Sequence, residues 1–230
     1  MFPHAARSTD NVTLPVEDVI IQPSGLPGIL HLPEHPHGIV IFAHGSGSSR
    51  LSPRNSQVAE GLGAAGFATL LFDLLTHDEA IDRRKVFDIP LLADRLVNSI
   101  KWVEAYEKTS RLPIGLFGAS TGAAAALIAA AAFGRRISAV VSRGGRPDLA
   151  ACAFSSVSSP TLLIVGAADR DVLALNEDAL AQLRCQKKLT IVPGATHLFD
   201  EPGALEAVIR EASDWFTARM TTPRRQARAG

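Results

Sequence analysis

Short apolar runs alternate with segments of helical spacing along most of the chain, which favours an α/β fold with a mostly parallel sheet and helices on both faces. Eight strands are expected, over residues 12–21, 28–32, 39–43, 67–72, 112–117, 137–141, 161–165 and 188–192. Helices are expected over residues 53–65, 88–106 and 123–132, and near 174–184 and 202–219. The first two strands are expected to form an antiparallel pair.

Local signals define the ends of one helix and the end of the domain. Ser52 is typical of an N-cap, Pro53 of a first helical turn and Gly66 of the position just after a helix. Apolar residues at helical spacing support the helix over 88–106, at Leu91, Leu92, Leu96, Ile100 and Val103. The last ten residues are polar and basic. We therefore expect a single domain over residues 1–220 and a disordered tail over 221–230.

Composition bears on partners and location. The chain has 230 residues, 47% of them hydrophobic, and its 23 Lys and Arg balance 23 Asp and Glu. A net charge of zero argues against a nucleic-acid binder. Neither a signal peptide nor an apolar run long enough to cross a bilayer is visible, and Cys152 and Cys185 form no disulfide framework. We expect a cytoplasmic protein without stable membrane association, whose oligomeric state the sequence does not specify.

The pentapeptide Gly118-Ala119-Ser120-Thr121-Gly122 carries the most specific chemical signal. The G-x-S-x-G pattern alone is common, but here an apolar strand precedes it and strong helix formers follow it. This context is typical of a nucleophile elbow, in which a sharp turn exposes a serine at the end of a strand. The two glycines let strand and helix pass close together, and the free N–H groups of the helix face a developing oxyanion. We therefore predict Ser120 to be a nucleophile.

A base and an orienting carboxylate are expected on loops that follow later strands. Asp169 comes after the strand over 161–165, and His197 comes after the strand over 188–192. The order Ser, Asp, His is typical of this architecture. Asp171 is an alternative carboxylate, and Asp169 could instead serve as a turn or N-cap residue. If Asp169 is the orienting residue, its carboxylate should lie within about 3.2 Å of Nδ1 of His197.

The second oxyanion donor is expected from the loop His44-Gly45-Ser46-Gly47-Ser48-Ser49, which follows the strand over 39–43. The candidate donors are the backbone N–H groups of Ser46 and Thr121, with Gly47 as the alternative to Ser46. His44 precedes the nucleophile in the sequence. We expect it to hold this loop by side-chain hydrogen bonding and to line the substrate site, rather than to act as the base.

These motifs resemble the α/β-hydrolase superfamily, most closely its small dienelactone-hydrolase-like branch. The resemblance covers roughly residues 12–219 and rests on His44-Gly45-Ser46-Gly47, the pentapeptide at 118–122, Gly166-Ala167-Ala168-Asp169 with Val172, and Gly194-Ala195-Thr196-His197. It implies an α/β-hydrolase fold and a triad of Ser120, Asp169 and His197. Dienelactone hydrolases carry cysteine as the nucleophile, and their substrate-binding arginines have no evident match here. A dienelactone substrate is therefore not implied.

Four arginines follow predicted strands on the edge of the sheet where ligands bind in open α/β folds. Arg50 and Arg54 follow the glycine-rich loop, and Arg143 and Arg146 follow the strand over 137–141. Of these, Arg50, Arg54 and Arg143 are candidates to bind a substrate carboxylate or phosphate. The alternative is a structural role, with Asp73, Asp148 or backbone carbonyls as partners.

We predict a serine hydrolase that cleaves a small ester or related acyl substrate through an acyl-enzyme. About twenty residues separate the strands over 137–141 and 161–165, which is room for a short helix but not for a cap domain. No cofactor is implied, and the turn with His31, His35 and His37 lacks the pattern of a metal site. The alternatives are a thioesterase or acyltransferase, and a non-catalytic binding protein with this fold.

Overall fold

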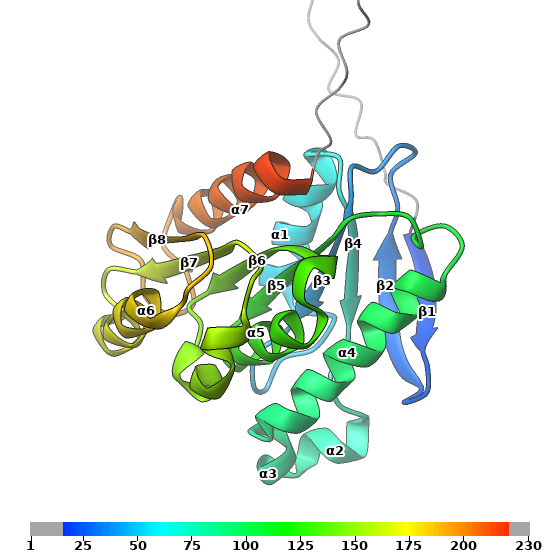
Figure 1. The fold of residues 1–230 in the computed structure, drawn as a ribbon, viewed down its shortest axis with the longest axis horizontal. Helices are drawn as coiled ribbons and strands as arrows, with labels where there is room; N and C mark the ends of the chain where they lie inside the picture. The colour runs from blue at the N-terminus through cyan, green and yellow to red at the C-terminus, as the bar shows by residue number, and fades with distance from the viewer. Residues whose placement is uncertain (1–15, 221–230) are drawn as a thin grey trace, which may run out of the picture.

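An eight-stranded sheet forms the centre of the protein in the computed structural model, which describes residues 16–220 (Figure 1). Its strands are β1 (Val16–Ile21), β2 (Leu26–His31), β3 (Ile39–Ala43), β4 (Ala68–Phe72), β5 (Ile114–Ala119), β6 (Ile137–Arg143), β7 (Thr161–Gly166) and β8 (Lys187–Val192). They lie in the order β1-β2-β4-β3-β5-β6-β7-β8. Part of the first predicted strand, residues 12–15, and the predicted tail over 221–230 lie outside the described residues.

The pairing of the strands confirms a mostly parallel sheet. β1 pairs with β2 and β2 with β4 in antiparallel register, as expected for the opening pair. All remaining neighbours, from β4 through β8, are parallel. The carboxyl ends of the parallel strands β3 to β8 therefore meet along one edge, and every predicted site residue lies at or just beyond that edge.

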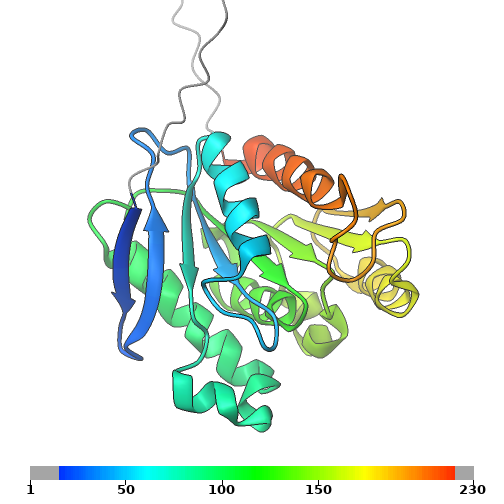
Figure 2. The same cartoon turned by 180° about the vertical axis from the view of Figure 1, so that it is seen from behind.

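Helices cover both faces of the sheet. One face carries α4 (Ile89–Ala105), α5 (Thr121–Phe133) and α6 (Arg170–Gln182), as Figure 1 shows. The other face carries α1 (Pro53–Ala64) and α7 (Ala204–Met220), which lie in front of the sheet in Figure 2. Each face has its own apolar core, because side chains of the strands alternate between the two layers.

Capping explains where the helices begin and end. The Ser52 hydroxyl accepts a hydrogen bond from the N–H of Asn55 at 3.4 Å, and Pro53 opens α1, as predicted. Gly66 follows this helix with φ +86°, a conformation that a side chain would disfavour. The Asp88 carboxylate accepts from the N–H of Leu91 at 3.0 Å and begins α4.

Two short helices between β4 and α4 were not expected from the sequence. These are α2 (His77–Ile81) and α3 (Arg83–Val86), and they lie beside the start of α4 in Figure 1. The signal was present, since Thr76 and Glu79 form a reciprocal capping box at the start of α2. Further along, α6 begins at Arg170 rather than near residue 174.

The segment between β6 and β7 agrees with the prediction of a short helix and no large cap domain. It contains the 3₁₀ helix η2 (Pro147–Ser156), and another short 3₁₀ helix, η1 (Gly134–Arg136), precedes β6. Within residues 16–220, no helix combines the length and the apolar character needed to cross a bilayer.

Candidate active site

Ser120 lies on the sharp turn between β5 and α5, where the nucleophile elbow was predicted. Its backbone has φ 52° and ψ −120°, an unfavourable conformation for a residue with a side chain. Strain of this kind costs on the order of 1–3 kcal/mol and is concentrated at functional sites. The turn is held by neighbouring segments, because the Ser120 N–H donates to the Arg143 carbonyl at 3.2 Å and the Arg146 N–H donates to the Ser120 carbonyl at 3.1 Å.

Three glycines allow the close approach that the elbow requires. A Cβ atom on Gly118 would lie 2.4 Å from the Cα of Ala123, and one on Gly122 would lie 2.1 Å from the Ala43 carbonyl oxygen. A Cβ on Gly45 would lie 3.0 Å from the Cβ of Ser120. The first two clashes involve backbone atoms, so no side-chain rotation relieves them. The loop after β3 therefore packs directly against the serine because Gly45 and Gly122 have no side chains.

Asp169 and His197 are joined by a hydrogen bond of 2.7 Å between Oδ2 and Nδ1, within the predicted distance. Asp169 occupies the N-cap position of α6, but its side chain does not cap the helix. The alternative carboxylate, Asp171, is exposed in the first turn of α6. The carboxylate of Asp169 is mostly buried while the imidazole of His197 is more exposed, with side-chain exposures of 16% and 39%.

Packing between strand ends brings His197 toward the elbow. Gly144 follows β6, and a Cβ at this position would lie 3.5 Å from Nδ1 of His197. The backbone carbonyl oxygen of the preceding residue, Arg143, accepts a hydrogen bond from the N–H of Ser120. The Ser120 hydroxyl does not hydrogen-bond with His197 in this structure, and such contacts in free enzymes often tighten only with substrate. His197 thus lies against the residue after Arg143, whose carbonyl oxygen accepts the Ser120 N–H.

The two predicted oxyanion residues contact each other. The N–H of Ser46 donates to Oγ1 of Thr121 at 3.0 Å. Thr121 is buried at the first position of α5, whereas Ser46 and the alternative Gly47 are exposed. The Ser46 N–H therefore has a protein acceptor in this structure, a contact that sequence reasoning did not anticipate.

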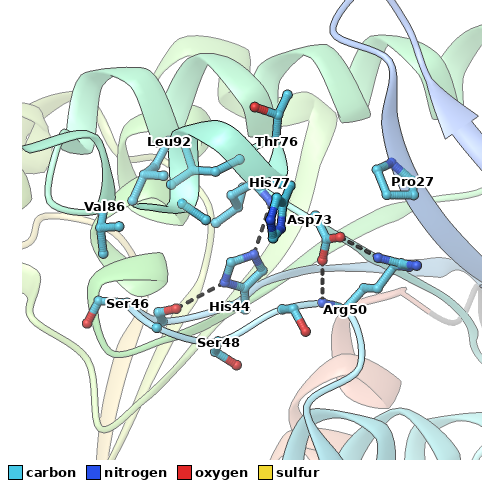
Figure 3. Close-up of a pocket in the computed structure, with 16 residues that line it drawn as sticks. Pro27, His44, Ser46, Ser48, Arg50, Asp73, Thr76, His77, Val86 and Leu92 are labelled. Atoms are coloured by element: carbon cyan, nitrogen blue, oxygen red, sulfur yellow. Dashed lines mark hydrogen bonds and ion pairs between the residues drawn. The ribbon is translucent and has the colours of Figure 1, made fainter. Parts of the chain in front are cut away.

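His44 ties together the loops that follow β3 and β4, as Figure 3 shows. Its Nε2 accepts the N–H of Leu74 at 3.0 Å, so the ring proton is on Nδ1 and points to the Gly45 carbonyl oxygen, also at 3.0 Å. Burial lowers the pKa of His44, although its hydrogen bond to Gly45 and the charge of Asp73 oppose this shift. A ring fixed at both nitrogens is a support for the loop rather than a free base.

A cavity of about 480 Å³ lies beside this loop (Figure 3). Its wall includes His44, the loop from Gly45 to Arg50, and a side formed by Leu74, Leu75, His77, Val86 and Leu92. Ser120 and His197 are not part of the lining. The cavity adjoins the elbow through Gly45, which packs against Ser120. No pattern in the sequence indicated its apolar wall, because that wall forms only where α3 and α4 meet the end of β4.

Three of the four arginines form ion pairs with carboxylates, which is the structural role considered as the alternative to ligand binding. Asp73 and Asp148 were expected as partners, whereas Asp200 was not. Arg50 forms an ion pair with Asp73, whose carboxylate also accepts the Arg50 N–H at 2.7 Å. Arg146 forms a two-point ion pair with Asp148, at 2.9 and 2.7 Å. Arg54 pairs with Asp200 at 3.1 Å near the surface. Arg143 differs from these, since its guanidinium is buried without an ion pair.

Fold and elbow together define an α/β hydrolase, and comparison with known proteins places the chain in that family. The family model of the alpha/beta hydrolase domain matches residues 36–213, so the chain belongs to this family. It is 54% identical to a dienelactone hydrolase of Anabaena variabilis, with a TM-score of 0.86 over 90% of this chain and 98% of the other. Est1E from Butyrivibrio proteoclasticus shares the fold, with a TM-score of 0.75 at 17% identity over 88% of this chain and 98% of the other. The predicted resemblance to dienelactone-hydrolase-like proteins is therefore confirmed.

Two curated relatives from Mycobacterium tuberculosis strains carry a different name. Each is called a putative phosphoribosyl transferase and is 57% identical over 205 residues, which are 89% of this chain and 46% of the relative. The chain thus spans about half the length of the curated relatives it matches. More than half of each relative lies outside the matched region, and the name describes the whole relative.

Proposed function

We propose that the protein is a serine hydrolase that cleaves small carboxylic esters through Ser120, His197 and Asp169. The observation that carries this proposal is the 2.7 Å contact between Asp169 and His197 beside a strained serine on a nucleophile elbow. A carboxylate that orients a histidine near a half-buried serine on an elbow is the arrangement that nucleophilic catalysis requires.

In the proposed mechanism, Nε2 of His197 accepts the proton of the Ser120 hydroxyl as its oxygen attacks the ester carbonyl carbon. Asp169 keeps the other ring proton on Nδ1 and stabilises the imidazolium. The imidazolium then protonates the departing alcohol as the C–O bond breaks, which leaves an acyl-enzyme. Water, deprotonated by the same histidine, hydrolyses the acyl-enzyme and releases the acid.

The oxyanion is held by backbone N–H groups of Thr121 and Ser46. Thr121 is the first residue of α5, so its N–H is among the free donors at the helix start, where the helix dipole also favours negative charge. Ser46 would have to share its N–H between Oγ1 of Thr121 and the oxyanion, or exchange one acceptor for the other. The Thr121 hydroxyl can then offer its own proton to the oxyanion. The two residues thus act as one unit.

The substrate is small in this proposal. The segment between β6 and β7 supplies only η2 above the sheet edge, and the cavity beside the oxyanion loop is about 480 Å³. Its wall from Leu74 to Leu92 is largely apolar and suits a short acyl or alcohol group. The transferase name of the mycobacterial relatives is not carried over, because most of each relative lies outside the match. We further propose a cytoplasmic location, because Cys152 and Cys185 are both free thiols in the structure.

Two separate assays test the proposal. One is labelling with a fluorophosphonate, and the other is hydrolysis of p-nitrophenyl acetate by unlabelled protein. The wild-type protein should be labelled on Ser120 and should hydrolyse the ester, and Ser120→Ala should lose both properties while it stays folded. Loss of a triad nucleophile costs on the order of 10⁴ to 10⁶ in kcat. Retention of more than about a tenth of the activity in Ser120→Ala would show the nucleophile to be another residue. Faster reaction of the acyl-enzyme with an added thiol or alcohol than with water would favour the acyltransferase alternative.

A further inference from the structure

Asn176 lies on α6 and is completely buried, with 0% of its surface exposed. Its Nδ2 atom donates to two carbonyl oxygens, that of Gly145 at 3.0 Å and that of Val172 at 2.7 Å. An amide NH₂ group has two protons, so both are used. The amide oxygen, Oδ1, is inaccessible and has no hydrogen-bond partner among the described residues, which destabilises the fold. The presence of asparagine here therefore points to a role beyond stability.

The Gly145 carbonyl belongs to a turn that contacts two residues of the proposed triad. This turn, residues 144–146, directly follows β6. Its first residue packs against His197, because a Cβ on this glycine would lie 3.5 Å from the Nδ1 atom of that residue. The backbone N–H of its last residue donates to the Ser120 carbonyl oxygen at 3.1 Å. Asn176 therefore holds the residue that lies between these two contacts.

Neighbouring elements confine this turn on several sides. A Cβ on Gly145 would lie 2.0 Å from Oγ of Ser142 in β6 and 2.6 Å from the Cβ of Ala123 in α5. The first N–H of the turn donates to the Ile164 carbonyl oxygen of β7 at 2.8 Å. These contacts fix the turn to β6, β7 and α5, and the amide of Asn176 ties it to α6 as well.

The same helix carries the orienting carboxylate. Asp169 is the N-cap of α6, and its carboxylate holds His197 through the 2.7 Å hydrogen bond to Nδ1. Asn176 lies about two helical turns further along, and its bond to the Val172 carbonyl lies within this span. These turns join the two residues as one rigid unit. A shift of α6 against the turn at 144–146 would therefore move Asp169 relative to Ser120.

We propose that Asn176 is a positioning residue of the triad, which locks the helix that carries Asp169 to the turn that supports Ser120 and His197. This inference rests on the proposed serine hydrolase function and adds a residue through which the triad is held in place. A displacement of about 1 Å between reacting groups costs on the order of 10²-fold in rate. The cavity lining includes neither Asn176 nor residues 144–146. Loss of the lock should therefore lower kcat and leave KM nearly unchanged.

Two variants and one matched control test the lock. Asn176→Ser retains the bond to the Val172 carbonyl, because a helical serine hydroxyl can donate to the carbonyl four residues before it, but it is too short to reach Gly145. Asn176→Ala is of nearly the same size and removes both bonds. The control is Thr109→Val, which removes a buried hydroxyl that donates to two backbone carbonyl oxygens, at 2.8 and 3.3 Å. Thr109 precedes β5, whereas the proposed site follows the carboxyl ends of the strands.

We expect kcat for p-nitrophenyl acetate to fall about 10- to 100-fold in both Asn176 variants, with KM within about twofold of wild type. The rate of labelling by a fluorophosphonate should fall to a similar extent, because it reports the reactivity of Ser120. Thr109→Val should keep kcat and the labelling rate within about twofold of wild type, although its melting temperature falls. All rates are measured at a temperature at which circular dichroism shows each protein to be folded.

Several results would overturn the lock. These are a wild-type kcat in Asn176→Ser, an equal loss of kcat in Thr109→Val, and a raised KM at unchanged kcat. A fall in Asn176→Ala alone would assign the effect to the bond inside α6. Wild-type rates in both Asn176 variants, together with an inactive Ser120→Ala, would reject the positioning role and leave the serine hydrolase in place. Full activity in Ser120→Ala would instead reject the hydrolase mechanism, and with it the triad that Asn176 positions.

Discussion

Replacement of His44 by alanine distinguishes a loop support from a catalytic base. The variant loses two hydrogen bonds, to Gly45 and from Leu74, each worth about 1 kcal/mol. It also leaves the buried N–H of Leu74 without an acceptor, at a cost of about 1–3 kcal/mol. Loss of buried ring contacts adds to this, so we expect the free energy of unfolding to fall by about 2–5 kcal/mol. A domain with a stability of about 5–15 kcal/mol still folds after such a loss.

The effect on catalysis should be smaller than that of removing the base. His44 fixes the loop that carries Gly45 and Ser46, so its loss disturbs at most one oxyanion donor, which is worth about 10²- to 10³-fold in kcat. Urea denaturation and p-nitrophenyl acetate hydrolysis measure the two effects, with His35→Ala, at an exposed position, as the control. A drop as large as that of His197→Ala at unchanged stability would refute this reasoning and make His44 a base.

The same residue predicts the direction of a pH effect on stability. Since burial lowers the pKa of His44 in the folded state, the unfolded chain binds more protons between that lowered pKa and the ordinary value of about 6.5. Stability should therefore decrease as the pH falls below about 6.5, with a slope of up to about 1.4 kcal/mol per pH unit from this one group. The pKa of His31 is also lowered by burial, so the difference in slope between wild type and His44→Ala isolates the contribution of His44.

Three further outcomes test the site. Asp169→Asn should lower kcat by less than His197→Ala does, and Asp171→Asn should leave kcat within about twofold of wild type, as steady-state kinetics would show; the opposite order for the two aspartates would identify Asp171 as the orienting residue. Gly122→Ala should yield little folded protein by circular dichroism, because its Cβ would lie 2.1 Å from the Ala43 carbonyl oxygen; wild-type stability would show that the β3 loop can shift. Among p-nitrophenyl esters, acyl chains of about two to four carbons should give higher kcat/KM than a chain of about twelve, because no cap domain covers a long chain; a preference for the long chain would contradict a small pocket.

The parts of the molecule that the sequence predicted well depend on local chemistry. The apolar runs indicated all eight strands, since strand position follows from the pattern of neighbouring side chains. The elbow was visible because its strand, its glycines and its helix are contiguous in the chain. Asp169 and His197 could be paired from the sequence alone, because the loops after successive parallel strands meet at one edge of the sheet.

The parts that the sequence did not predict depend on contacts between distant segments. The Ser46 N–H meets the Thr121 hydroxyl across 75 residues, and Arg54 pairs with Asp200 across 146. Nothing local to either residue specifies such a partner. The apolar wall of the cavity forms where α3 and α4 meet the end of β4. The local signals for α2 and α3 were the capping box of Thr76 and Glu79 and the N-cap Asp82.

The position at which β6 ends determines whether the Arg143 side chain is buried or lies on a loop. The sequence placed the end of the strand at Val141, which left Arg143 and Arg146 on the loop that follows it. In the structure β6 continues to Arg143, so the alternation of strand side chains applies to it. Val141 faces the core beneath α1 and α7, and Arg143, two residues on, shares that face instead of reaching solvent. Arg50, Arg54 and Arg146 form ion pairs with carboxylates, whereas the Nε and Nη1 atoms of Arg143 have no hydrogen-bond partner among the described residues. The two additional strand residues thus place the Arg143 side chain in the buried layer on that face of the sheet rather than on the loop.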